Sequence, residues 1–155
     1  MNIFYLSSNP KKAAEYHCDS HSVKMPVESV QMLVTARVMN NDLSIEQVKE
    51  HADQMSMMYS HPSLDLDGPT YNDIFKTHYT PRMRNHPCSI WVRECFYGFG
   101  YLQDLLTCLG DEYTKRYGKK HKSVLFYESL PTARIRFRRR KKMPVPLAEI
   151  GRAHV

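Results

Sequence analysis

One predicted helix carries a row of side chains that can donate, accept and transfer protons. The row comprises His17, His21, Lys24, Glu28, Gln31 and Thr35. Successive members are 4, 3, 4, 3 and 4 residues apart, so all six share one face if the helix is continuous. Two imidazoles, an ammonium and a carboxylate in line suit general acid–base catalysis. A polar network buried between helices, or an ordinary solvent-facing stripe, would have the same spacing, and both alternatives stay open.

A second candidate cluster begins at Asn85-His86-Pro87 and continues through Trp91 to Arg93. His86 is expected at a helix N-terminus, where the dipole favours the neutral imidazole and lets it act as a donor or a base. Arg93 faces a different direction from Trp91 and is a candidate phosphate contact. Trp91 itself is expected in the core rather than at a stacking site.

A third candidate cluster mixes aromatic and basic side chains near residue 120. Its members are Tyr113, Arg116, Tyr117, Gly118, Lys119, His121 and Lys122. This composition is typical of a surface that contacts a nucleic-acid backbone. The wider segment 115–142 holds twelve Lys or Arg and one acid, for a charge of +11, whereas the rest of the chain sums to −5. Such a block favours a polyanionic partner, although a solvated basic tail without a specific partner has the same composition.

A metal site is an alternative use of the same histidines. His17 and His21, four residues apart on a helix, could hold one ion with His86 or Asp19 as the third ligand. The chain has no HExxH motif, and its four cysteines, at positions 18, 88, 95 and 108, form no CxxC pair. We therefore predict no metal and no other cofactor, and we expect most of the cysteines to be small core residues.

The helix that carries the row follows a short apolar segment. Residues 3–6 are expected either as a strand or as the segment that attaches the N-terminus to the core. Asn9 and Pro10 then predict a helix start, with the asparagine as N-cap. Pro26 predicts either two helices that meet near residues 19–25 or one kinked helix over 11–38. Its apolar side is expected to contain Val23, Val27, Val30, Val34 and Val38.

A second helix is predicted after a turn at residues 40–42. Ser44 and Gln47 form a capping box for this helix, which is expected to run to about Met58. Residues 59–86 contain several prolines and aromatic residues and are expected to form a long ordered loop.

A third helical region is predicted from His86 onwards. Gly98 and Gly100 are expected to introduce kinks, and Gly118 is expected to end the helix. Beyond it, arginines at 134, 136 and 138 alternate with the apolar residues at 135 and 137. The expected apolar set of the region is Trp91, Cys95, Phe99, Leu102, Leu105, Leu106, Leu109 and Tyr113.

The composition indicates a folded protein of mainly α class. With 155 residues and a hydrophobic fraction of 42%, the chain can form a core, and we expect a compact helical bundle with a short N-terminal extended segment and a long ordered loop. A single helical domain is expected over residues 1–123, followed by a basic C-terminal segment over 124–148. No run approaches the roughly 18 apolar residues that span a bilayer, and the N-terminus lacks a signal peptide's apolar region. These features predict a cytoplasmic protein with reduced cysteines.

The last residues, 149–155, are expected not to belong to the natural protein. The run EIGRAHV can be back-translated to a nucleotide sequence containing the start of a widely used sequencing adapter. We therefore expect residues 149–155 to be an artefact of a truncated assembly, with the natural C-terminus missing. Re-amplification of the gene from source DNA with the same stop after Val155 would contradict this expectation.

Three short motifs follow one another along the chain. They are VESVQML at residues 27–33, NHPCSIW at 85–91, and the pairs Glu112-Tyr113 and Arg116-Tyr117. With the segments around them, roughly residues 1–38 and 76–123, they resemble a widespread group of small phage proteins. That group is in turn similar to the pyrimidine-dimer DNA glycosylase family of the endonuclease V type, whose members have comparable motifs in the same order.

The resemblance implies a compact helical fold without a metal, and DNA glycosylase activity with abasic-site lyase activity. In that family an amine attacks C1′ of the sugar to form an imine, and a glutamate on the first long helix assists. Glu28 matches that glutamate. The best-known members use the amine of a small second residue, whereas Asn2 is expected to leave Met1 in place. The nucleophile is then expected to be the Met1 amine or Lys24.

The leading hypothesis is a phage-type enzyme of DNA repair or modification. It would act on duplex DNA at a damaged or modified base and open the site as in base flipping. Its expected catalytic residues are Glu28, His21, Lys24 and Met1. Its expected substrate-binding residues are His17, Gln31, His86, Arg93, Arg116, Lys119, His121 and Lys122. Neither a membrane nor an obligate protein partner is expected. The alternatives are a non-catalytic nucleic-acid-binding accessory protein that uses residues 115–142, and a metal-dependent hydrolase.

Overall fold

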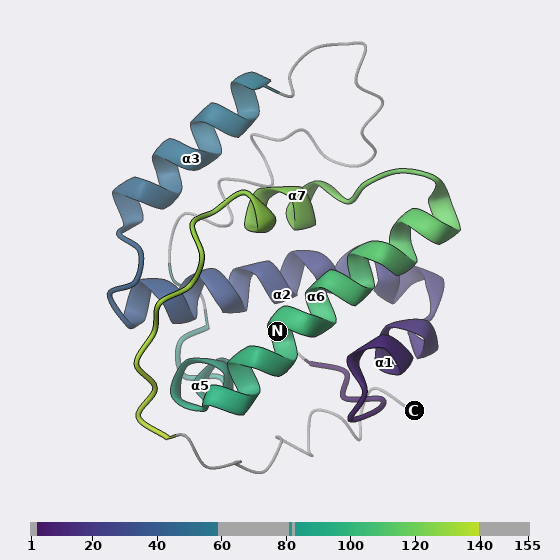
Figure 1. Ribbon diagram of the computed structural model, residues 1–155, viewed down its shortest axis with the longest axis horizontal. Helices are drawn as coiled ribbons and strands as arrows, with labels where there is room; N and C mark the ends of the chain where they lie inside the picture. The colour runs from purple at the N-terminus through teal and green to yellow at the C-terminus, as the bar shows by residue number, and fades with distance from the viewer. Residues whose placement is uncertain (1–2, 59–80, 82, 140–155) are drawn as a thin grey trace.

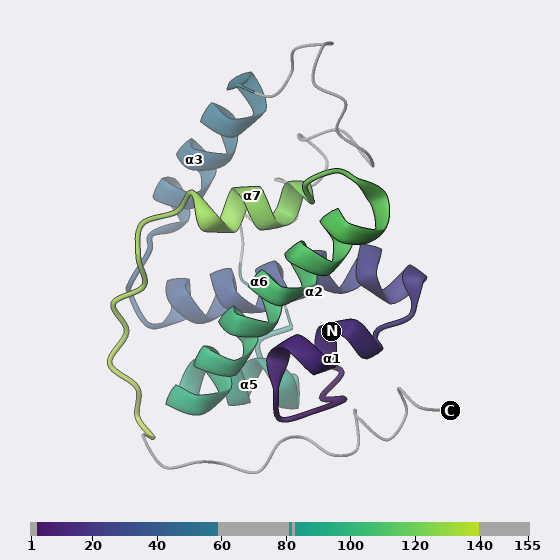
Figure 2. The same ribbon diagram turned by 45° about the vertical axis from the view of Figure 1, so that its right-hand side comes forward.

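The computed structural model describes residues 3–58, 81 and 83–139. Over these ranges the chain forms six helices and no strand, and the expected mainly α bundle is confirmed. The central element is α2 (Asp19–Met39), against which α5, α6 and α7 all pack. The long helix α6 (Phe96–Tyr117) crosses α2, with α1 packed beside it (Figure 1). Seen after a turn of 45°, α3 rises beside α7, and its residues Val48, Ala52 and Met55 are buried in the core (Figure 2).

The first helix, α1 (Pro10–Tyr16), starts as predicted. Asn9 is its N-cap and accepts hydrogen bonds from the amides of the next two non-proline residues. The chain then breaks at His17 and Cys18, whose backbones are extended, so the region forms two helices, which meet just before the predicted residues 19–25. Pro26 does not cause the break. It lies buried inside α2, where packing on neighbouring helices outweighs the single hydrogen bond that its missing N–H removes.

The predicted valine side of α2 is only partly correct. Val30 and Val34 are fully buried, but Val23, near the start of the helix, is 44% exposed. The second half of α2 is enclosed by several helices, so polar residues such as Thr35 and Arg37 are buried there as well. A helix surrounded on several sides does not divide into one apolar and one polar face, and the one-sided pattern therefore fails.

The turn and the capping box that follow α2 are confirmed. Asn41 adopts a left-handed conformation with φ of 57°. The amide of Ser44 donates to the side chain of Gln47, and the amide of Gln47 donates to the Ser44 hydroxyl, as a capping box requires. They precede α3 (Ile45–Met58), which ends where predicted. Most of the loop expected over 59–86 lies outside the described residues.

The third helical region consists of two helices, α5 (Pro87–Glu94) and α6, which meet at Cys95. Gly98 and Gly100 both lie within α6 and interrupt neither its start nor its end, so the break in this region falls at Cys95. Gly98 has a packing role instead: a Cβ there would lie 2.7 Å from the carbonyl oxygen of Trp91 and 2.8 Å from its ring. The whole apolar set predicted for this region is buried.

The chain after α6 contributes to the core before it becomes a basic segment. Gly118 ends α6 in the left-handed conformation, with φ of 71°, as predicted. The short helix α7 (Lys122–Glu128) then packs against α2 and α6, with Val124 and Phe126 buried. It lies across residue 123, where a domain boundary was expected. From the end of α7 the chain runs without regular structure along one side of the bundle to the start of α6 (Figures 1 and 2).

The N-terminal segment is not a strand, but it does attach the start of the chain to the core. Ile3 and Phe4 are both buried. Two of the cysteines, Cys88 and Cys95, are buried, whereas Cys18 is exposed and Cys108 is half-buried. None of the helices in the described part of the chain is both long enough and apolar enough to cross a bilayer.

Candidate nucleic-acid interface

Part of the predicted acid–base row survives on α2. Because α2 is continuous from Asp19 to Met39, the spacing keeps His21, Lys24 and Glu28 on one face, together with Gln31. The first member of this row, His21, is half-buried, and Lys24 after it is exposed. From Lys24 onwards exposure decreases, because Glu28 and Gln31 are half-buried and Thr35 is buried inside the bundle.

His17 lies outside this face, because it caps α1 and precedes α2. It is 3% exposed, and its Nδ1–H donates to the carbonyl of Ala13 at 2.6 Å. Burial lowers the pKa of this imidazole, and nearby positive charge on His21 and Arg116 lowers the pKa further. A substrate-binding role was expected for His17, but its position is that of a neutral structural residue.

The N-terminal segment reaches the start of the row through Phe4. The ring of Phe4 lies 4.4 Å from that of His21 and 5.8 Å from that of His17, measured between centroids. The described chain therefore begins beside the first turns of α2. Met1, whose amine was expected as a nucleophile, lies outside the described residues.

The second cluster lies apart from the acid–base row. His86 is the N-cap of α5, and its Nδ1 accepts from the amide of Cys88 at 3.2 Å. Arg93 donates to the carbonyl of Arg84 and contacts Met39, the last residue of α2, at 3.6 Å. Glu28 is eleven residues before Met39, or about 16 Å along the helix. The structure thus places Arg93 and Glu28 at different points along α2.

Arg116 holds helices together. Its guanidinium donates to the carbonyls of Glu15 and His17 and to the side chains of Asp19 and Glu112, at 2.8 to 3.1 Å. It also donates to the hydroxyl of Ser22 at 2.8 Å. This arginine was expected to bind DNA, but these contacts join α6 to the break between α1 and α2. The i, i+4 pair with Glu112 is the part of this network that the sequence contains locally.

His121 is also occupied by internal hydrogen bonds. It is the N-cap of α7: its Nδ1 accepts from the amide of Ser123 at 3.2 Å, while its Nε2–H donates to the carbonyl of Val23 at 2.8 Å. Burial lowers its pKa, and the charge of Lys122 lowers the pKa further. Lys122 is only 6% exposed, and Lys119 is half-buried. Of the predicted basic cluster, few charged groups are therefore available to a partner.

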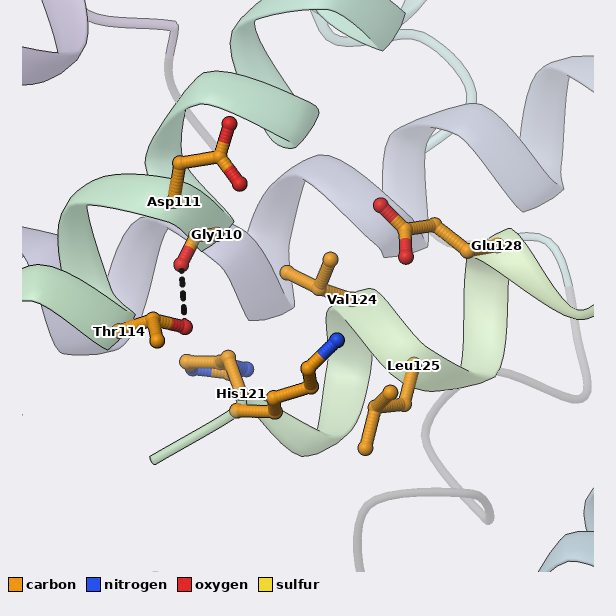
Figure 3. Close-up of a pocket in the computed structure, with 8 residues that line it drawn as sticks. Gly110, Asp111, Thr114, His121, Val124, Leu125 and Glu128 are labelled. Atoms are coloured by element: carbon orange, nitrogen blue, oxygen red, sulfur yellow. Dashed lines mark hydrogen bonds between the residues drawn. The ribbon is translucent and has the colours of Figure 1, made fainter. Parts of the chain in front are cut away.

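A small pocket of about 200 Å³ lies between α6 and α7 at this place (Figure 3). Asp111 and Glu128 approach it from the two helices, and Lys120 also lines it. Thr114 donates its hydroxyl proton to the carbonyl of Gly110 at 3.0 Å. His121 faces the pocket, but both of its ring nitrogens are hydrogen-bonded. The pocket is lined by charges of both signs. His121 has no ring nitrogen left for proton transfer with a ligand in this pocket.

The clearest basic surface is the segment after α7. Arg134, Arg136, Arg138 and Arg139 are exposed, and their guanidinium groups make no hydrogen bond or ion pair with any residue that the structure describes. The intervening Ala133, Ile135 and Phe137 pack against the core. The alternation of arginine and apolar residues noted in the sequence therefore corresponds to an outer and an inner side. We call residues 134–139 the arginine segment.

The arginine segment is held by backbone contacts at both ends. The amide of Arg134 donates to Asp42 Oδ1 at 2.9 Å. The amide of Arg139 donates to the carbonyl of Glu94 at 3.1 Å, and the carbonyl of Arg139 accepts from the amide of Phe96 at 3.0 Å. Between them, the ring of Phe137 lies 5.3 Å from that of Phe99. The arginines are therefore presented from a fixed backbone.

Sequence reasoning missed an open groove beside the arginine segment. Its volume is about 440 Å³, and residues of the N-terminal segment, the start of α1, α5 and the first half of α6 line it. Its aromatic members are Tyr5, Trp91, Phe96, Tyr97 and Tyr101. We call it the aromatic groove. The cluster of aromatic residues and glycines over 96–101 was its local signal, but the contribution of Tyr5 depends on the tertiary fold.

Comparisons with models of known families, with curated proteins and with solved structures find no significant match. The resemblance to the pyrimidine-dimer glycosylases stays a prediction. Within the described ranges, no three His, Cys, Asp or Glu side chains lie close enough together to hold a metal ion.

Proposed function

We propose that this protein binds nucleic acid through the arginine segment. The observation that carries the proposal is the row of four exposed guanidinium groups, which have no hydrogen-bond or ion-pair partner among the described residues, on a backbone that is fixed at both ends. An unpaired cation on a protein surface is available to an anionic ligand at little cost in desolvation or broken contacts. Arg116, whose guanidinium is already satisfied, would not be available in this way.

A row of cations on one side of the segment suits a polyanion. Nucleic acid carries one negative charge on every phosphate, so several arginines of the row can contact phosphates of the same molecule. The formal net charge of +6 adds long-range attraction to the same partners.

The test is the salt dependence of binding to a labelled oligonucleotide, measured by fluorescence anisotropy. Changing Arg134, Arg136 and Arg138 together to glutamine should weaken binding at least tenfold and reduce the slope of log K against log salt by about 2 to 3. The matched control replaces Lys12, Lys49 and Arg84 by glutamine, because these residues are exposed elsewhere and carry the same total charge. The control should retain most of the slope.

Two results would contradict the proposal. If the wild-type protein binds neither single-stranded nor duplex oligonucleotide at low salt, the function is wrong. If the control variant loses as much of the slope as the arginine variant, binding depends on overall charge and the segment has no special role.

A second candidate function, abasic-site lyase and glycosylase activity at α2, is favoured by one observation. His21, Lys24 and Glu28 remain on one face of a continuous helix, and Phe4 brings the N-terminal segment beside it. An amine and a carboxylate on such a face supply the groups that imine chemistry at a sugar needs. Borohydride should then trap a covalent adduct with duplex DNA containing an abasic site. Glu28→Gln should slow strand cleavage, and the exposed control Glu46→Gln should not.

A further inference from the structure

The aromatic groove exposes apolar rings that the fold does not use in its core. Phe96 and Tyr97 are 50% and 51% exposed at the start of α6. Tyr101, deeper in the groove, packs between Tyr5 at 4.6 Å and Trp91 at 6.2 Å, measured between ring centroids. The hydroxyl of Tyr101 donates to the carbonyl of Ser7 at 2.8 Å, which fixes this ring in place. The groove therefore has a rigid aromatic wall and an exposed aromatic rim.

Gly100 keeps the groove open. It lines the groove from α6, and a Cβ built at this residue would have no atom within 4 Å among the described residues, apart from its chain neighbours and the backbone of its own helix. Glycine inside a helix costs about 1 kcal/mol relative to alanine. No packing contact requires this glycine, in contrast to Gly98 two residues earlier, which gives room to Trp91. The open space above Gly100 therefore belongs to the groove. The volume of the groove, about 440 Å³, is in the range of small-molecule sites, about 300–1,000 Å³.

The two ends of the groove differ in charge. Phe96 contacts Phe137 at 5.8 Å and is hydrogen-bonded to the backbone of Arg139, so this end adjoins the arginine segment. Asp104 lines the groove eight residues further along α6, about 12 Å away. A ligand with an anionic part and an aromatic part would place its anion near the arginines and away from Asp104.

We infer that the aromatic groove receives unpaired bases of single-stranded nucleic acid whose phosphates lie on the arginine segment. The inference rests on the proposed function and names its substrate class. Stacking of bases on aromatic side chains next to a basic track is the common way to bind single strands without strong sequence preference. In a duplex the bases stack on each other, so a duplex meets only the arginines.

The direct test uses Gly100→Leu, which fills the groove without removing a charge or a packing contact. The wild-type protein should bind a single-stranded oligonucleotide more tightly than the same sequence as a duplex. Gly100→Leu should weaken single-strand binding by about 5- to 150-fold, the range measured for loss of one stacked base, and leave duplex binding unchanged. The control Thr107→Leu adds the same side chain at an exposed position of α6 outside the groove and should bind as wild type.

An independent measurement uses Trp91, the single tryptophan of the chain. Because Trp91 lines the groove, the single-stranded oligonucleotide should change its fluorescence with the same midpoint as the anisotropy. The duplex should not change it. Far-UV circular dichroism and unfolding of Gly100→Leu check that the variant is folded.

The outcomes separate this inference from the proposed function. If Gly100→Leu binds single strands like wild type while the arginine variant binds them weakly, the groove inference is wrong and the proposed function stands. If the arginine variant binds as wild type, the proposed function is wrong. A third outcome would also overturn the inference. In it, the wild-type protein self-associates in sedimentation, Gly100→Leu abolishes this self-association, and the wild-type protein binds single-stranded and duplex oligonucleotides with equal affinity. The groove would then bind a second copy of the chain.

Discussion

At the scale of single residues, histidine has a structural role here that its position in the sequence did not reveal. His121 uses one nitrogen to cap α7 and the other to bind the carbonyl of Val23 on α2. Only the neutral ring with its proton on Nε2 can make both bonds. His17 likewise donates to a carbonyl from a buried position. Both residues were expected at a substrate, and both are used by the fold.

These histidines predict a loss of stability in mild acid. Burial is the main cause that lowers the pKa values of His17, His51 and His121 below the ordinary value of 6.5. As the pH falls below about 6.5 the unfolded chain takes up protons that the folded chain resists, so the free energy of unfolding falls until the folded-state pKa values are reached. Urea unfolding followed by circular dichroism should therefore give a lower stability at about pH 5.5 than at about pH 7.5.

The variant His121→Asn tests the contribution of one ring. Asparagine keeps an oxygen that can cap α7 but does not titrate. The variant should be less stable than wild type at neutral pH, because the bond to Val23 is lost, and its stability should depend less on pH. A pH dependence equal to that of wild type would contradict a role for His121.

At the scale of elements, two glycines in one helix predict opposite effects of the same substitution. Gly98→Ala should destabilise the protein by about 1–3 kcal/mol, because its Cβ would overlap the backbone and ring of Trp91. Gly100→Ala meets open space and should stabilise the protein by about 1 kcal/mol through helix propensity. Thermal and urea unfolding of the two variants give the comparison. If the two substitutions changed the free energy of unfolding equally, α5 would have to shift away from α6 to make room for the new Cβ at residue 98.

The same elements show what the sequence predicts and what it does not. The cap at Asn9, the capping box at Ser44 and the stop at Gly118 are correct because each depends on hydrogen bonds within a few residues. The helix break at Cys95 was missed, and the sequence did not decide whether a helix continues through Pro26, because both depend on packing between helices.

The candidate site follows the same division. The alternation of arginine and apolar residues over 134–139 was visible in the sequence, since its period is local. The aromatic groove was not, because Tyr5 and Tyr101 are brought together only by the fold. Arg116 was misread for the same reason, since the carbonyls that satisfy it belong to residues about a hundred positions away.

At the scale of the whole molecule, Arg37 joins parts of the chain that are far apart in sequence. It is buried near the end of α2, where it pairs with Asp42 at 2.7 Å and donates to the carbonyl of Pro131 at 2.5 Å. Its guanidinium also lies 5.6 Å from the ring centre of Tyr127. One side chain thus links α2, the turn after it, α7 and the start of the chain's last described segment.

Removal of this arginine should destabilise the whole fold. Arg37→Met leaves the buried carboxylate of Asp42 without its cation and should lower the free energy of unfolding by about 3–5 kcal/mol in urea. The double variant with Asp42→Asn should recover part of this loss, because the amide oxygen can still accept from Arg134. Losses that simply add in the double variant would contradict the coupling of the two side chains.

The arginine segment has a consequence for how this surface can change over time. Its ends are held through the amides of Arg134 and Arg139, and its inner side by Ile135 and Phe137. The guanidinium groups contribute nothing to that attachment. Mutation at 134, 136 or 138 can therefore change which ligand the segment binds, and how tightly, without unfolding the protein. Evolution or protein engineering can change this surface one residue at a time.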